Sequence, residues 1–121
     1  MILVDTSVWI DHLRTADERL VAHLEAGQVL CHPFVVGELA LGNLRDGDVV
    51  ISLLGALPTA AVATPDEVLT FITRHRLNGR GLGYVDTHLL AATAITPEAR
   101  LWSRDRRLSQ AARSLGLVAA G

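Results

Sequence analysis

The stretch ILVDTSVWIDHL, residues 2–13, contains the pattern from which the fold is inferred. Ile2-Leu3-Val4 is a short apolar run that ends at Asp5, which is typical of a buried strand. Thr6 and Ser7 are candidate helix N-caps, and the apolar residues that follow them recur at helical spacing. We therefore expect a strand that passes directly into a helix, with Asp5 at the junction.

The alternation of strand and helix continues along the chain. The sequence predicts strands over 2–4, 28–31, 60–63, 100–102 and 115–119, and helices over 8–13, 17–26, 33–45, 47–55, from Pro65 through Ile72, over 84–96, and from a cap at Ser103 through Ala112. No hairpin dipeptide stands between paired strands, so parallel pairing with helical crossovers is favoured. We predict a single domain over 1–121 with a three-layer α/β/α fold and a central, mostly parallel five-stranded sheet.

The composition fits one folded domain. The chain has 121 residues, of which 50% are hydrophobic and 20% charged, a balance that can bury a core. Its longest apolar runs fall far short of the roughly 20 residues that span a bilayer, and the first residues form no basic leader, so we expect a cytoplasmic protein without a membrane partner. The single Cys31 excludes an internal disulfide and a multi-cysteine zinc site.

The cationic residues are unusual because all eleven are arginines. Without lysine, the chain cannot carry the chemistry of phosphate-loop nucleotidases or of Schiff-base enzymes. The charges are also unevenly distributed, with three arginines and ten acids in residues 1–73 but eight arginines and three acids in 74–121. This asymmetry predicts a basic face that can contact an anion such as nucleic acid, although such a pattern can also serve only solubility.

Four carboxylates occur where a solvated surface acid is not expected. Asp5 and Asp105 follow predicted strands, and ligands of parallel sheets bind beyond the carboxyl ends of strands. Glu38 lies in an apolar helix and is predicted to point at packed surface, and Asp86 is predicted to point inward from a first helical turn. The structural alternatives are helix caps for Asp5 and Asp105, a buried salt bridge to arginine for Glu38, and the helix macrodipole for Asp86.

A cluster of four carboxylates must take up protons or bind cations. Hard oxygen ligands match Mg²⁺ or Mn²⁺, and the five histidines lack the spacing of a zinc site. A divalent cation held in this way can activate water and offset charge on a phosphodiester, which predicts hydrolysis of nucleic acid. The candidate contacts to the RNA backbone are Arg74, Arg76, Arg80, Arg104, Arg106 and Arg107, with surface ion pairs as the alternative for each of them.

Four segments in this order resemble the PIN domain, specifically the VapC-type toxins: DTSVWID at 5–11, GEL at 37–39, DTHLLAA at 86–92 and LWSRD at 101–105. The resemblance implies a metal-dependent endoribonuclease of a prokaryotic toxin–antitoxin pair. It implies catalytic and Mg²⁺- or Mn²⁺-binding roles for Asp5, Glu38, Asp86 and Asp105, with Thr6 and Ser103 as supporting residues. It also implies a homodimer and a cognate antitoxin whose tail occupies the cleft.

Two other functions are compatible with parts of this pattern. In a non-catalytic interaction module, the acids would be caps and salt bridges and the arginines would bind a protein or nucleic-acid partner. A metal-dependent phosphatase is disfavoured because Asp5-Thr6-Ser7 lacks the second aspartate of the DxD nucleophile motif.

Overall fold

The computed structural model describes residues 1–119 and contains three strands and seven helices within that range. The strands are β1 (Ile2–Val4), β2 (Val29–Leu30) and β3 (Arg100–Trp102). The helices are α1 (Thr6–Arg14), α2 (Glu18–Glu25), α3 (Pro33–Leu41), α4 (Gly47–Gly55), α5 (Pro65–His75), α6 (Tyr84–Ile95) and α7 (Arg106–Ser114). None of these helices is long and apolar enough to cross a bilayer.

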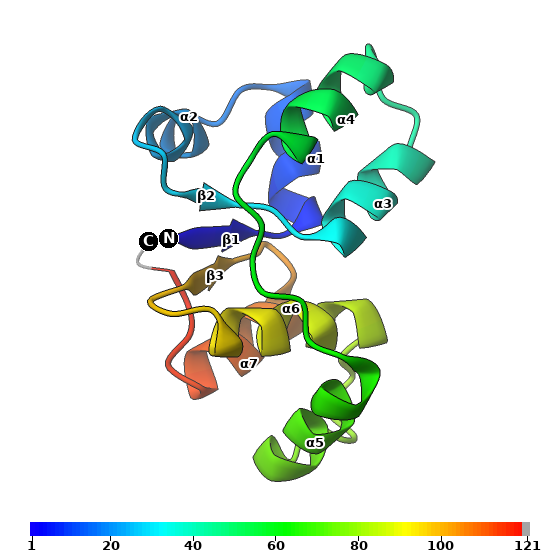
Figure 1. The fold of residues 1–121 in the computed structure, drawn as a ribbon, viewed down its shortest axis with the longest axis vertical. Helices are drawn as coiled ribbons and strands as arrows, with labels where there is room; N and C mark the ends of the chain where they lie inside the picture. The colour runs from blue at the N-terminus through cyan, green and yellow to red at the C-terminus, as the bar shows by residue number, and fades with distance from the viewer. Residues whose placement is uncertain (120–121) are drawn as a thin grey trace.

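The sheet is parallel throughout, in the order β2-β1-β3. Leu3, in the central strand, is in register with Leu30 on one side and Leu101 on the other. Leu3 and Val4 are both fully buried, and successive strand residues point to opposite faces, so both faces of the sheet are covered. In Figure 1, helices α1 to α4 lie above the strands and α5 to α7 below them. The predicted three-layer arrangement agrees with this packing.

The prediction of five strands is wrong, because the segments 60–63 and 115–119 form no strand. In their place the structure has two single parallel bridges, Cys31 with Thr59 and Leu101 with Val118. The shortness of the neighbouring strands explains this result, because alternate residues of a strand turn their backbone groups to opposite edges. In the three-residue β3, only Leu101 bonds to the outer segment, through Leu117 O and Ala119 N.

Side-chain caps close to each end determine where several helices begin. Thr64 and Glu67 form the capping box that begins α5. Asp17 caps α2 by accepting hydrogen bonds from two backbone amides. The helix predicted over 33–45 is shorter than expected, because the chain leaves α3 in an extended conformation at Gly42.

The sheet positions the chain segments that carry the polar residues. The backbone N–H of Asp5 donates to Trp102 O at 2.9 Å, so the ends of β1 and β3 lie side by side. Helix α6 packs against β3, and α1 packs against α3. The residues that follow β1 and β3, one face of α3 and the first turn of α6 therefore meet at the carboxyl edge of the sheet.

Candidate active site

Asp5 is the buried carboxylate of this edge. Only 4% of its surface is exposed, and its Oδ2 accepts hydrogen bonds from Ser7 Oγ at 2.7 Å and Ser103 Oγ at 2.8 Å. Although Asp5 occupies the N-cap position of α1, its side chain makes no capping hydrogen bond within the described chain. The helix-cap alternative for Asp5 is therefore wrong, and its carboxylate is held by two hydroxyl groups.

Ser103 joins the ends of two strands. The expectation that it caps the last helix is wrong, because the N-cap of α7 is Asp105. Ser103 Oγ accepts from the backbone N–H of Asp105 at 2.9 Å while it donates to Asp5. Ser7 makes a parallel link, since its Oγ accepts from the backbone N–H of Arg104 at 2.9 Å. Sequence reasoning treated Ser7 only as a possible cap.

Glu38 is exposed, contrary to the prediction that it points at packed surface. The buried residues of α3 are Val35 and Leu39, and Glu38 lies away from them at the rim of the site. Its Oε1 accepts a hydrogen bond from Thr6 Oγ1 at 2.8 Å. The alternative of a buried salt bridge is also wrong, since no arginine pairs with Glu38 among residues 1–119.

Asp86 lies half-buried in the first turn of α6. Burial, followed by the negative charges of Asp5, Asp105 and Glu38, raises the pKa of Asp86 from 3.8 to about 6. Asp86 therefore lies close enough to the other three carboxylates for their charges to act on it. The N-cap of this helix is Gly83, where an added Cβ would lie 3.7 Å from Asp86 Oδ2, so residue 83 lies beside this carboxylate.

Asp105 is exposed and caps α7, with Oδ1 accepting from the backbone N–H of Leu108 at 2.9 Å. The cap alternative is thus correct for Asp105. The cap does not remove this residue from the cluster, because its charge contributes to the raised pKa of Asp86. Asp105 can stabilise the helix and add negative charge to the site at the same time.

The donor set fits a hard divalent cation by charge and by ligand type. Burial and then the nearby like charges raise the pKa of Asp86, so this carboxyl group binds a proton more readily than a solvated aspartate does. Among residues 1–119, no three His, Cys, Asp or Glu side chains are grouped closely enough to form a complete direct ligand set. Mg²⁺ often retains several waters and needs only one or two carboxylates, so the arrangement is compatible with water-mediated binding.

The candidate RNA-contacting arginines occupy different environments. Arg104 pairs with Asp11 at 2.5 Å and with Asp17, which fits the surface ion-pair alternative. Arg74 lines a depression that also contains Ile95, at the opposite end of α6 from Asp86, and Arg76 forms the C-cap of α5.

Three other arginines belong to segments that carry or adjoin the site residues. Arg106 and Arg107 form the start of α7 beside Asp105, and Arg80 belongs to the loop that leads into α6. A Cβ added at Gly81 would lie 2.9 Å from Arg107 Nη1, so the Arg107 side chain rests against this loop. These three arginines remain predicted contacts to the RNA backbone.

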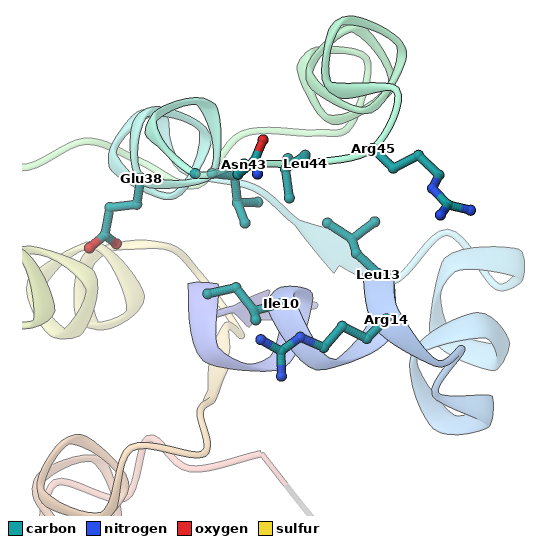
Figure 2. Close-up of a pocket in the computed structure, with 9 residues that line it drawn as sticks. Ile10, Leu13, Arg14, Glu38, Asn43, Leu44 and Arg45 are labelled. Atoms are coloured by element: carbon teal, nitrogen blue, oxygen red, sulfur yellow. The ribbon is translucent and has the colours of Figure 1, made fainter.

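A pocket of about 640 Å³ lies beside the cluster and was not anticipated from the sequence. Figure 2 shows it between α1 and the segment 42–45 that follows α3, with Glu38 at one end. Its lining combines the apolar Ile10, Leu13 and Leu44 with Arg14 and Arg45. Ile10 and Leu13 are among the exposed large apolar side chains, but the helical spacing of the apolar residues in α1 did not distinguish them from the buried Val8 and Trp9.

The raised pKa of Asp86 predicts a specific pH dependence of stability. The folded protein binds the Asp86 proton more tightly than the unfolded chain does, so protonation of Asp86 stabilises the fold. This stabilisation is complete below about pH 4 and is lost as the pH rises through about 6. We expect Asp86→Asn to remove this loss and to raise the free energy of unfolding at pH 7 by about 1 kcal/mol, after allowance for solvent screening.

Urea unfolding with a chelator, at about pH 4.5 and about pH 7, measures this effect. The exposed Glu25→Gln variant is the control and should keep the pH dependence of the unmodified protein. Identical pH dependence in the unmodified protein and the Asp86→Asn variant would contradict the cluster.

Comparisons with known proteins show the family of this chain. A family model described as the PIN domain matches residues 2–114. Two proteins named Ribonuclease VapC32, from Mycobacterium tuberculosis strains CDC 1551 / Oshkosh and ATCC 25618 / H37Rv, are each 53% identical to this chain over 120 residues. The alignments cover 99% of this chain and 97% of each relative. The chain therefore belongs to the PIN domain family, with VapC proteins among its relatives.

Proposed function

We propose that this protein is a metal-dependent endoribonuclease toxin of the VapC type, which hydrolyses phosphodiester bonds of RNA and is inhibited by a cognate antitoxin. The observation that carries the proposal is the arrangement of the acids at one sheet edge, where Ser103 Oγ donates to Asp5 Oδ2 at 2.8 Å and where burial and the three other carboxylates raise the pKa of Asp86. The ribonuclease name of the two relatives supports the same reaction.

Asp5, Glu38, Asp86 and Asp105 are the proposed catalytic and metal-binding residues, and Mg²⁺ or Mn²⁺ is the proposed cation. When bound, the cation offsets charge on the phosphodiester and activates water. Glu38 is the best candidate to orient the attacking water, because it is exposed at the rim and Thr6 fixes one of its oxygens. Thr6 is therefore a positioning residue.

Ser7 and Ser103 fix the orientation of Asp5. Both hydroxyl groups donate to the same oxygen, Oδ2, so Oδ1 is directed to the other side of the carboxylate. A ligand fixed in this way loses less side-chain entropy on binding a cation. We therefore assign Ser103 a supporting role, with Ser7 beside it.

Two surfaces suit the proposed protein partners. The pocket between α1 and the 42–45 segment combines apolar and basic residues, which suits an antitoxin segment with apolar and acidic side chains. The α3–α4 region exposes Leu41 by 91%, Val49 by 59% and Leu53 by 66%, which suits a homodimer contact. We propose a cytoplasmic location for the protein.

The proposed reaction predicts loss of RNA cleavage in Asp5→Asn and Asp86→Asn. Removing a ligand charge is expected to lower the cleavage rate by roughly 100-fold or more. The measurement is cleavage of purified cellular RNA by antitoxin-free protein with Mn²⁺ or Mg²⁺, with a chelator as the metal-free control and Glu25→Gln as the matched surface variant. Undiminished cleavage by both aspartate variants would reject the site and favour the interaction-module alternative.

Ser103→Ala is expected to lower the cleavage rate by about 10- to 100-fold and to shift the rate dependence to higher Mn²⁺ concentrations. The reason is that Asp5 loses one of its two hydroxyl donors. Ser103→Thr keeps a hydroxyl group and should restore both properties, and Ser114→Ala on α7 is the control. A cation dependence that is unchanged in Ser103→Ala would show that Asp5 does not need this donor.

Leu53→Asp is expected to weaken the homodimer by roughly 10-fold or more, because a charge would be buried in an apolar contact. Light scattering over a concentration series measures the monomer–dimer equilibrium. Leu69→Asp is a matched control, because Leu69 on α5 is 58% exposed and lies outside the α3–α4 region. An equal effect of the two substitutions would place the contact elsewhere.

A further inference from the structure

The side chain of Arg104 joins three elements of the fold. Its Nη1 donates to Asp11 Oδ2 on α1 at 2.5 Å, and its Nη2 donates to Asp17 Oδ2. Asp17 is the N-cap of α2, and Arg104 itself lies in the turn between β3 and α7. One guanidinium group therefore connects the residues that follow β3 to both α1 and the start of α2.

The backbone of Arg104 contacts the candidate site. Its N–H donates to Ser7 Oγ at 2.9 Å, and Ser7 Oγ donates to Asp5 Oδ2 at 2.7 Å. On the other side, Ser103 Oγ donates to the same Oδ2 and accepts from the backbone N–H of Asp105. Both hydroxyl groups that hold Asp5 are thus oriented by backbone groups of one short turn.

Side chains, rather than regular structure, hold this turn. Residues 103–105 belong to no helix or strand. Apart from the two serine hydroxyl groups at the site, Ser109 Oγ donates to Ser103 O at 2.9 Å, and Arg104 makes its two ion pairs. A planar guanidinium group that is bonded at both ends has little rotational freedom, so it restricts the backbone that carries it.

The ion pairs are also fixed relative to the sheet. The central carbon of the Arg104 guanidinium lies 6.0 Å from the centroid of the Trp102 ring, and that of Arg19 on α2 lies 4.7 Å from the same centroid. Trp102 is 9% exposed, and its O accepts from the backbone N–H of Asp5. A largely buried ring beneath a cation adds to the attraction. The charged group therefore lies on the strand that pairs with β1.

The same contacts make Arg104 a poor group for phosphate. Both terminal nitrogens of its guanidinium donate to carboxylates, and the trio of Arg104, Asp11 and Asp17 contains one cation and two acids. Such a group does not attract an anion. The candidate RNA contact predicted at this residue thus has a different explanation.

We propose that Arg104 is a positioning residue: by binding Asp11 and Asp17, it fixes the turn 103–105 so that the two serine hydroxyl groups hold Asp5 in the orientation that binds the cation. This inference rests on the proposed nuclease function. Groups that orient a metal ligand through hydrogen bonds change the affinity for the metal. Exposed ion pairs contribute little to global stability, so the main effect is expected in the turn and at the site.

The first measurement needs neither cation nor RNA. Amide exchange with water, followed by NMR in a chelator, reports on the hydrogen bond from the Asp105 N–H to Ser103. Asp11→Ala removes one ion pair and leaves the sequence around the turn unchanged, and it should speed this exchange by about 2- to 5-fold. Glu25→Ala is the control. The N–H of the buried Val68, which donates to Thr64 O, should exchange at the same rate in all variants.

The second measurement is the affinity for Mn²⁺ without RNA, from the spectroscopic signal of the free ion. Arg104→Gln and Asp11→Ala should each weaken binding by about 2- to 5-fold, less than the loss of a direct hydrogen-bond partner of a ligand causes. The double variant should be no weaker than Arg104→Gln alone, because both changes remove one interaction. Arg104→Lys keeps the charge without the planar fork and should resemble Arg104→Gln. Arg113→Gln, on the exposed side of α7, is the control.

Three results would overturn the positioning role. The first is unchanged exchange of the Asp105 N–H in Asp11→Ala. The second is faster exchange with unchanged affinity for Mn²⁺, because the turn would then not act on Asp5. The third is a loss of RNA affinity in Arg104→Gln that Arg104→Lys restores while the affinity for Mn²⁺ stays constant, which would make Arg104 a phosphate contact.

The outcomes separate this inference from the proposed function. If the unmodified protein cleaves RNA with Mn²⁺ and the variants keep its amide exchange and affinity for Mn²⁺, the positioning role is wrong and the nuclease assignment stands. If the unmodified protein neither binds Mn²⁺ nor cleaves RNA, both proposals fail.

Discussion

The half-buried placement of Asp86 near three other carboxylates is the constraint on which the candidate site depends. Asp86 is half-buried in the field of three other acids, and its raised pKa records the cost of that placement. The fold tolerates the crowding because the other members have their own hydrogen-bond donors: two hydroxyl groups for Asp5, one hydroxyl group for Glu38 and a helix N-terminal amide for Asp105. Apart from the amide of Leu108, these donors come from Thr6, Ser7 and Ser103, which belong to the same short segments as the acids. The site is thus stabilised locally, without an arginine that would neutralise it within the described chain.

The short strands bring the residues that follow β1 and β3 together at the site. Because β1 and β3 have three residues each and are adjacent, the chain leaves both at the same edge, and Asp5 and Ser103 meet there at hydrogen-bond distance. The same shortness limits the segment 115–119 to one bridge, since only Leu101 of β3 turns its backbone groups towards it. A single geometric property therefore explains both the meeting of Asp5 with Ser103 and the absence of the strand expected over 115–119 from the part of the chain that the structure describes.

The sequence was sufficient for the parts of the structure that depend on local pattern. Strand–helix alternation around Asp5 and the capping signal at Thr64 depend on neighbouring residues, and both predictions agree with the structure. Contacts between segments far apart in the chain were not accessible in this way. The exposure of Glu38 depends on where α3 meets α1, and the role of Ser103 depends on the pairing of β1 with β3. A helical position predicts which residues share a face, but it does not predict whether that face meets the core or the rim of a cleft.

The arginines show why a charge count cannot be translated directly into a binding surface. Arg104 belongs to the basic C-terminal segment, yet it pairs with Asp11 and Asp17 of the acidic N-terminal segment. Part of the uneven charge distribution therefore joins the two segments in the fold. Trp102 lies beneath this guanidinium, 6.0 Å from its central carbon to the ring centroid, which fixes the link on the sheet. Arg107, three residues further on, turns instead towards the loop before α6. Arg104 and Arg107 thus have different roles: Arg104 joins two parts of the fold, whereas Arg107 remains a candidate for contact with RNA.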